Sequence, residues 1–296
     1  MQAFGTHDEK ACVSRSFLFV PADSERKLEK AEGVDADALI LDLEDAVTPE
    51  ARPAARRLAA AYLQGRQTTW VRINPIDTDD ALADLEAVMP SAPAGIVLPK
   101  PRTATDAVIL AKHLDGFEAQ HGIEPGSTKI MAICTEHPAA LFSLDGYSGA
   151  TSRLYGLSWG AEDLAAAVGA STNRDESGNW LPQYEMARSL CLFAAAAAEV
   201  AAVDTVFTDF RDLDGLLRYA RKARRDGFNG MLAIHPAQVD VINAAFEPTA
   251  EELEYAARII RLFDENPGAG TVGLDGKMVD RPHLIQAQRL LQAFRK

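Results

Sequence analysis

Short apolar segments alternate with longer segments of helical periodicity along most of the chain. The apolar segments are rich in Val, Ile, Leu and Phe, which is typical of parallel strands that are buried on both faces. The intervening segments carry apolar residues at helical intervals, for example at 80–89 and 212–227, and Ser24 is placed to cap a helix at 24–34. This pattern predicts strands at 17–21, 38–44, 69–74, 95–100, 129–136, 153–160, 204–210 and 230–236.

Eight strand–helix units in succession predict an α/β chain that closes into a (β/α)8 TIM barrel. We place the barrel at 14–236, after a flexible N-terminal segment at 1–13. A C-terminal helical extension at 237–296 follows, with one helix at 249–266, a turn-rich stretch and a last helix from His283. We expect this extension to contact a neighbouring subunit.

Charge and composition exclude several classes of function. The 296 residues carry a formal net charge of −13, which repels a phosphate backbone, so nucleic acid is not expected as a partner. The longest apolar run, 191–203, is interrupted by Glu199 and is too short to span a membrane; it is interpreted as a buried, Ala-rich helix. Three widely spaced cysteines and an N-terminus without a signal-peptide pattern predict a cytoplasmic protein without a disulfide framework.

Polar or ionisable residues stand at the end of nearly every predicted strand. In a barrel of this kind the active site lies where the strands end, so these residues predict a ring of polar groups at one mouth. They are Asp42, Glu44 and Asp45 after the second strand, Arg72 and Asn74 on the third, and Lys100, Glu136, Glu162, Asp163, Asp209 and His235 after later strands.

The acidic members of this ring predict a metal site. Carboxylates that lie close together raise one another's pKa unless a cation neutralises them. Because no His or Cys pair stands at ligand spacing, we expect a hard ion, Mg²⁺ or Mn²⁺, with Glu136 and Asp163 as ligands. The alternative is that each acid only caps the helix that follows its strand.

Arg72 lies in an otherwise apolar strand, where a guanidinium needs an anion nearby. We expect acids of the second strand such as Glu44 to fix its fork while its outer face meets a substrate carboxylate. A purely structural buried pair is the alternative. His235 stays unassigned between a general base and a hydrogen-bonded structural residue, and His137 is interpreted as a helix start.

Eight motifs in order give the chain a resemblance to a known family. They run from about Ser14 to the C-terminal region: SRSFLFVPADSERKLEKA, DALILDLEDAV, VRIN, VLPK, TEHPAAL, GAEDLAAAVG, GFNGMLAIHPAQV and GKMVDRP. Together they resemble the citrate lyase beta-subunit-like and malyl-CoA lyase group of the HpcH/HpaI aldolase superfamily. The resemblance implies a Mg²⁺-dependent carbon–carbon lyase that cleaves or forms a short 3-hydroxyacyl-CoA, such as malyl-CoA or citramalyl-CoA, from an acyl-CoA and a 2-oxo acid.

The resemblance also implies roles for single residues. Glu136 and Asp163 match the Mg²⁺ ligands, and Arg72 matches the residue that contacts the reacting oxygens. Asp280 matches an acid/base that reaches the active site of a neighbouring subunit, in a homotrimer or a hexamer. Coenzyme A is expected near Lys30.

Glu44 and Asn74 complete the set of predicted site residues, as a catalytic and a substrate-binding candidate. Four other functions stay open: the citryl-ACP lyase beta subunit of citrate lyase, a malyl-CoA thioesterase, a non-catalytic module that binds a CoA thioester, and a class II aldolase acting on non-thioester sugars, which would leave the Lys30 and Asp280 matches unexplained. Two departures from the family bear on the substrate. Met231 stands where many relatives have Lys, and an insertion at 171–185 is placed to reshape the pocket.

Overall fold

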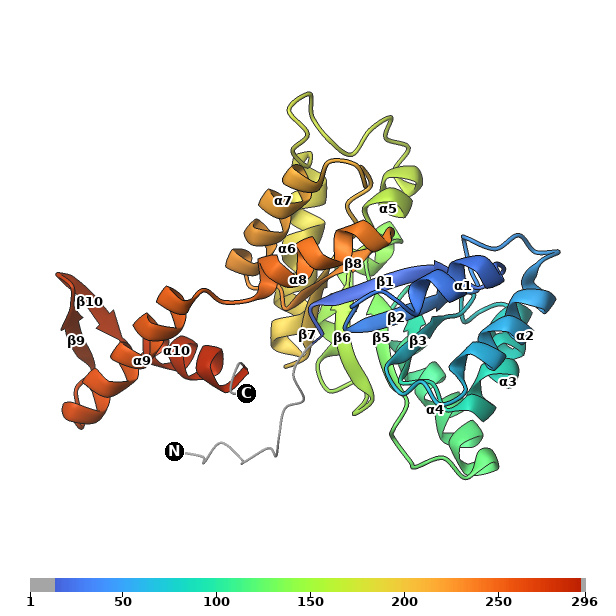
Figure 1. Cartoon of the computed structure of the whole chain (residues 1–296), viewed down its shortest axis with the longest axis horizontal. Coiled ribbons are helices and arrows are strands. Elements are labelled where there is room, and N and C mark those ends of the chain that lie inside the picture. Colours follow the sequence, from blue (N-terminus) through green and yellow to red (C-terminus); the bar gives the residue numbers. More distant parts are fainter. Residues whose placement is uncertain (1–13, 294–296) are drawn as a thin grey trace. The chain divides into compact units, whose positions relative to one another are not determined.

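The predicted TIM barrel is confirmed by a computed structural model, which describes residues 14–293 of the chain. Its parallel strands form one closed barrel in the order of the sequence (Figure 1). The strands are β1 (Ser16–Pro21), β2 (Ala38–Asp42), β3 (Thr69–Arg72), β4 (Gly95–Leu98), β5 (Lys129–Ile133), β6 (Leu154–Ser158), β7 (Ala201–Asp204) and β8 (Gly230–Ala233).

The helices that follow these strands lie outside the ring (Figure 1). They are α1 (Glu25–Ala31), α2 (Arg52–Leu63), α3 (Asp79–Val88), α4 (Ala104–His121), α5 (Ala161–Ala167), α6 (Pro182–Ala197), α7 (Leu213–Asp226) and α8 (Val239–Phe246). Short 3-10 helices also occur, η1 (Met89–Ser91), η2 (Pro138–Phe142), η3 (Leu144–Tyr147) and η4 (Pro236–Gln238). Among the helices described, none is both long and apolar enough to cross a membrane.

Side chains alternate between the inside of the barrel and the layer beneath the helices. Along β2, Ile40 packs in the inner apolar cluster and Leu41 in the outer one. Because successive side chains of a strand point to opposite faces, Asp42 takes the next inward position. On β3, Trp70 points into the barrel in the same way, so Arg72, two residues later, takes the next inward position. The strand register makes Asp42 and Arg72 direct neighbours, so the alternation itself brings an acid and a base together.

The seventh strand lies earlier than predicted. We expected it at 204–210 and interpreted 191–203 as one helix, but α6 ends at Ala197 and β7 covers Ala201–Asp204. Glu199, with φ of 56°, turns the chain between them. An Ala-rich apolar run satisfies a buried helix and a buried strand equally well, so periodicity could not divide it. Asp204 therefore ends β7, and Asp209 lies in the loop beyond it.

The larger of two compact units covers Ser14–Phe246. The segment from Val239 to Phe246, expected in the extension, is α8 and packs on β1 and β8 as the last covering helix of the barrel. The predicted flexible segment 1–13 lies outside the described residues.

A second compact unit covers the described residues from Glu247 onwards. It contains α9 (Ala250–Glu265), the antiparallel hairpin of β9 (Thr271–Leu274) and β10 (Lys277–Asp280), and α10 (Arg281–Ala293). The predicted turn-rich stretch thus forms the hairpin. This unit has an apolar core of its own, made of Ala256, Ile259, Phe263, Leu274, Val279 and Ala287.

We expect Gly95→Ala to destabilise the barrel. A Cβ atom at this position would lie 2.2 Å from the Trp70 ring. That ring cannot easily move, because it packs edge to face on Phe17 and Tyr155 at centroid distances of 5.9 and 5.1 Å. Overpacking of this kind costs about 1–3 kcal/mol. A lower midpoint of urea unfolding is the expected result.

Gly116→Ala is the matched control. Gly116 is exposed on α4, and its added Cβ would have no neighbour within 4 Å. Alanine is the better helix former, so this variant should gain about 0.5–1 kcal/mol. Equal unfolding midpoints for the two variants would contradict the close packing that we describe inside the barrel.

Candidate functional site

Arg72 is held by Asp42 at the mouth of the barrel. Asp42 Oδ1 accepts a hydrogen bond from Nε at 2.8 Å, and Asp42 Oδ2 accepts one from Nη2 at 2.6 Å. The Arg72 guanidinium also lies 4.7 Å from the centroid of the Phe19 ring. This two-point contact fixes the plane of the guanidinium, because both oxygens of one carboxylate are engaged.

Glu44 connects Arg72 with a second cation. Its Oε2 lies 3.1 Å from Arg72 Nη1, and its Oε1 accepts a hydrogen bond from Lys100 Nζ at 2.5 Å. The expectation that second-strand acids fix Arg72 is therefore confirmed, although Asp42 rather than Glu44 supplies the bidentate contact. Burial raises the pKa of Glu44, and Arg72 and Lys100 offset only part of that effect.

Lys100 has two roles that the sequence did not reveal. Its backbone N–H donates to Glu136 Oε2 at 2.6 Å, and its Nζ lies 2.9 Å from Asp45 and 3.4 Å from Asp163. The backbone adopts a left-handed conformation, with φ of 52°, so that main chain and side chain both meet the site. Burial would lower the pKa of Lys100, but the hydrogen bonds to Glu44 and Asp45 outweigh it and raise the pKa.

Glu136 is the most deeply buried of the predicted metal ligands, at 5% exposure. Burial raises its pKa well above the usual range, and the Asp163 carboxylate raises it further. Gly160 leaves room for this side chain, since a Cβ there would lie 2.5 Å from Glu136 Cγ. A carboxylate placed in this way is stabilised most by a cation close to it.

A cavity of about 310 Å³ brings the two predicted metal ligands together. Glu136 and Asp163 both border it, and no group of three or more His, Cys, Asp or Glu residues in the described part of the chain is arranged to hold a metal. Two carboxylates with free positions around them suit a hard ion such as Mg²⁺, which keeps several ligands from water or substrate. The lining residues are Pro75, Asp77, Lys100, Arg102, Glu136, His137, Asp163 and Ala167.

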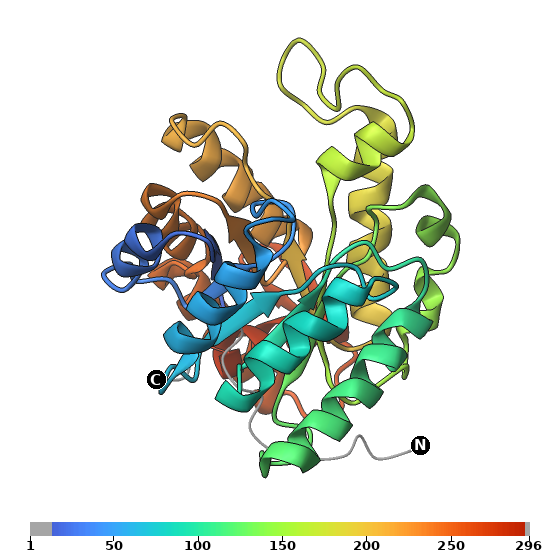
Figure 2. The same ribbon diagram turned by 90° about the vertical axis from the view of Figure 1, so that its right-hand side faces the viewer.

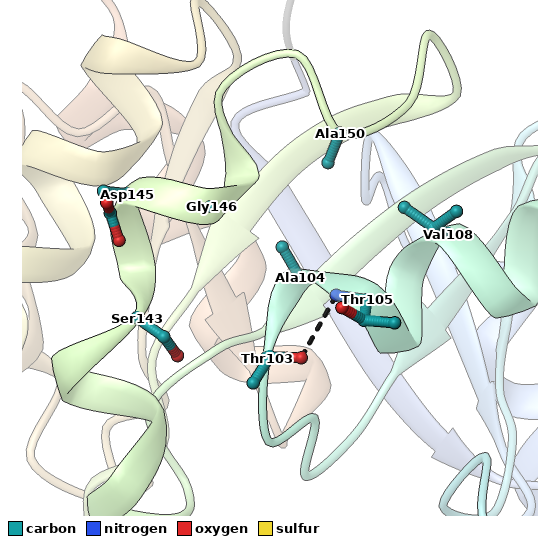
Figure 3. Close-up of a pocket in the computed structure, with 8 residues that line it drawn as sticks. All are labelled: Thr103, Ala104, Thr105, Val108, Ser143, Asp145, Gly146 and Ala150. Atoms are coloured by element: carbon teal, nitrogen blue, oxygen red, sulfur yellow. Dashed lines mark hydrogen bonds between the residues drawn. The ribbon is translucent and has the colours of Figure 1, made fainter.

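A second cavity, of about 250 Å³, lies at the start of α4. Figure 3 shows its walls, with Thr103 and Ala104 on one side and Ser143 and Asp145 on the other. Asp145 is its single charged lining residue. It therefore offers no arrangement comparable to the carboxylates and cations of the first cavity.

Asn74 lies beneath the site. Its backbone N–H and its side-chain amide both donate to Asp84 Oδ2 at 2.8 Å, and the amide also donates to the Leu43 carbonyl at 3.0 Å. Asp84 Oδ1 in turn accepts a hydrogen bond from Arg56 Nε at 2.7 Å. These bonds tie β3 to α3, and substrate binding by Asn74 stays a prediction.

Lys30 and Asp280 are not brought to the cavity by any described contact. Lys30 is exposed in the last turn of α1. Asp280 ends β10 in the second unit, where its Oδ1 lies 2.5 Å from His283 Nδ1. That hydrogen bond holds the pKa of Asp280 below its usual range. Both roles therefore stay predictions.

The two histidines near the strand ends begin 3-10 helices. His137 Nδ1 accepts from the Ala139 N–H, which confirms the interpretation of His137 as a helix start. His235 Nδ1 accepts from the Ala237 N–H and the ring stacks on Phe210 at 4.9 Å, in keeping with a structural residue. Met231, the departure from the family pattern, is fully buried in the outer apolar layer.

Comparison with known proteins places this geometry in context. The family model described as HpcH/HpaI aldolase/citrate lyase matches residues 15–236. A (3S)-malyl-CoA thioesterase of Cereibacter sphaeroides (strain KD131 / KCTC 12085) is 35% identical over 284 residues, which are 94% of this chain and 93% of that protein. Citrate lyase subunit beta of Haemophilus influenzae is 34% identical over 286 residues, covering 95% of this chain and 96% of that protein.

Solved structures give the same picture. Protein CitE from Mycobacterium tuberculosis, in complex with magnesium, acetoacetate and coenzyme A, superposes with a TM-score of 0.79 at 32% identity, covering 95% of this chain and 97% of that one. The citrate lyase beta subunit from M. tuberculosis complexed with oxaloacetate and magnesium gives a TM-score of 0.69 at 33% identity, covering 79% and 97%.

We expect Glu136→Gln to stabilise the protein in the absence of divalent cations. The folded state raises the pKa of Glu136 above its unfolded value, so stability is lost as the pH rises through the folded pKa. The amide cannot ionise and still accepts from the Lys100 N–H. Thermal unfolding in EDTA should show a gain within the range of about 0.5–3 kcal/mol at pH 8 and a smaller one at pH 5.

Asp77→Asn is the control, because Asp77 borders the same cavity but is exposed. It should change the unfolding temperature little at either pH. A gain for Glu136→Gln that is the same at pH 5 and pH 8 would mean that ionisation of Glu136 does not limit stability.

Proposed function

Because the chain belongs to the HpcH/HpaI aldolase/citrate lyase family, we propose that it is a Mg²⁺-dependent carbon–carbon lyase acting on a short 3-hydroxyacyl-CoA. Malyl-CoA and citramalyl-CoA are the substrates that we place first, with an acyl-CoA and a 2-oxo acid as the products of cleavage. The observation that carries the proposal is the cavity bordered by Glu136, Asp163 and Lys100, which Glu44 joins to Arg72.

Glu136 and Asp163 are the residues that would hold Mg²⁺. A divalent cation relieves the unfavourable burial of Glu136 and its repulsion from Asp163. When bound, Mg²⁺ would act as a Lewis acid toward the oxygens of the 2-oxo acid. The magnesium complexes of the M. tuberculosis protein CitE support this choice of ion, and Mn²⁺ is the alternative.

Arg72 is the residue that we assign to the negative charge on the thioester oxygen. Breaking the carbon–carbon bond leaves an enolate of the acyl-CoA, and a fixed guanidinium stabilises such charge as it develops. Burial would lower the pKa of Arg72, but the hydrogen bonds to Asp42 and the Glu44 charge raise it, so the group stays positive. Glu44 contributes to catalysis by orienting Arg72 and Lys100, which it touches on its two oxygens.

Asp280 is the acid/base that we assign to a neighbouring subunit, in a homotrimer or hexamer. Its lowered pKa keeps it a carboxylate, which can accept the α-proton of the acyl-CoA in the condensation direction. In cleavage the same carboxylate would first take up the proton that the 3-hydroxyl group loses and then deliver it to the enolate carbon. Lys30 and Asn74 are proposed to contact coenzyme A and the acid part of the substrate.

Two related activities have specific support. Similarity to the (3S)-malyl-CoA thioesterase favours hydrolysis of the thioester on the same site. Similarity to citrate lyase subunit beta favours a substrate carried on an acyl-carrier protein. Both would use the same cations at the mouth of the barrel. The products distinguish them from the CoA-dependent lyase.

We expect the purified protein to convert malyl-CoA or citramalyl-CoA to an acyl-CoA and a 2-oxo acid in the presence of Mg²⁺. The assay follows the 2-oxo acid and free coenzyme A separately, with and without EDTA. Oxo acid without free coenzyme A is the result for a lyase, and Asp163→Asn should lower its rate at least 100-fold, in the range seen when groups that stabilise transition-state charge are lost.

Free coenzyme A without oxo acid would overturn the lyase in favour of the thioesterase. Activity on a carrier-bound thioester alone would favour the citrate lyase subunit. Silence on both, together with unchanged binding of a CoA thioester by Glu136→Ala, would point to the non-catalytic module.

Two inactive variants should restore activity to each other if Asp280 acts in a neighbouring site. Arg72→Met disables the barrel, and Asp280→Asn disables the hairpin. Co-expressed with different tags and purified as mixed oligomers, they should show about a third of the parent activity in a trimer and about a quarter in a hexamer, because a working site then combines the intact barrel of one chain with the intact hairpin of another. Absence of recovery in mixed oligomers would assign Asp280 to its own chain or to no catalytic role.

A further inference from the structure

The loop between α5 and α6, residues 168–181, is internally ordered. It projects past the ends of both helices (Figure 2). At its tip, Asp175 Oδ1 accepts from the Ser177 and Asn179 N–H groups at 2.9 and 2.8 Å. Arg174 and Trp180 form an antiparallel bridge across it. The loop therefore presents its side chains in set positions.

Two side-chain hydrogen bonds anchor this loop to the barrel. Asn173 Nδ2 donates to Glu162 Oε1 at 2.9 Å, and Glu162 directly precedes Asp163. Trp180 Nε1 lies 3.1 Å from the Tyr219 hydroxyl on α7. The loop is thus tied to the same strand end that supplies Asp163.

Arg174 is the charged side chain that this loop orders. Its guanidinium lies 3.5 Å from the centroid of the Trp180 ring and 5.9 Å from those of Phe207 and Tyr219. Nη1 donates to the Gly178 carbonyl at 2.8 Å. Across residues 14–293, no carboxylate lies within ion-pair distance of Arg174, and no hydrogen bond engages its Nε or Nη2.

This environment differs from that of two other arginines in the barrel. Arg72 donates to both oxygens of Asp42, Arg188 donates to Asp204 through Nε and Nη2, and hydrogen bonds and charge raise the pKa of both arginines despite burial. Burial lowers the pKa of Arg174, since no such partner is at hand. A half-buried guanidinium with free donors is stabilised by an anion from outside the chain. The absence of an ion pair is notable because acidic residues outnumber basic ones in this chain, which has a net charge of −13.

We propose that Arg174 binds a phosphate group of coenzyme A in the thioester substrate. The inference rests on the proposed function, which supplies an anionic ligand. Arg174 does not border the cavity of Glu136 and Asp163, so its anion belongs to a part of the ligand away from the reacting carbons. In a CoA thioester the distant anionic groups are phosphates, and the planar fork of arginine binds them through two donors. A cation–π contact with the Trp180 ring fixes the plane of the Arg174 guanidinium.

Calorimetric titration with coenzyme A tests this assignment without catalysis. Arg174→Met keeps the apolar contact with Trp180 but removes the charge, and it should weaken binding about 10- to 100-fold, as expected for lost hydrogen bonds to a charged group. Arg174→Lys should fall between this variant and the parent chain, because it restores the charge but not the fork. Arg221→Met, which removes an exposed arginine of α7, is the control and should bind as the parent does.

A titration with 3′-dephospho-coenzyme A identifies which phosphate is bound. If the 3′-phosphate is the partner, Arg174→Met and the parent chain should bind this ligand equally; if the pyrophosphate is the partner, the difference should persist. Equal binding of coenzyme A by parent and Arg174→Met overturns the inference and leaves the proposed function intact. A parent chain that binds no coenzyme A overturns both.

Discussion

The site depends on a balance between carboxylates and two cations at the carboxyl ends of the barrel strands. Asp42, Glu44 and Asp45 share Arg72 and Lys100, and Asp163 lies at the edge of the same cluster. The two residues of each ion pair are far apart in sequence, and the barrel brings them together. The closed ring of parallel strands is therefore what turns separate strand-end acids into one electrostatic unit.

The pattern of the sequence predicted most of this framework because its information is local. Apolar runs, strand-end acids and an arginine in an apolar strand need no knowledge of distant contacts, and they led to Glu136, Asp163 and Arg72. The double role of Lys100 was not accessible in the same way, because it depends on a left-handed backbone at one residue and on the spacing of three strands. The predicted position of β7 was wrong because an alanine-rich apolar sequence has no periodicity that distinguishes a buried helix from a buried strand.

The arginines illustrate how one residue type serves different ends in a single fold. Arg153, with Asp115 and Glu118, and Arg188, with Asp204, are fully compensated and tie helices to strands. Arg72 is likewise paired with two acids, Asp42 and Glu44, whereas Arg174 rests on an aromatic ring. Among these four arginines, only Arg174 has no carboxylate within ion-pair distance in the described part of the chain, and this is what singles it out for an external anion.

The separate apolar core of the second unit has a consequence for how such proteins can diversify. Ala256, Phe263 and Val279 pack with one another, so the hairpin that carries Asp280 is supported from within its own unit. A change of side chain in the barrel mouth then leaves that support untouched, and a change in the hairpin leaves the ion pairs of the barrel untouched. In the proposed reaction, the hairpin would supply proton transfer and the barrel would supply charge stabilisation, so each part could acquire substitutions independently of the other.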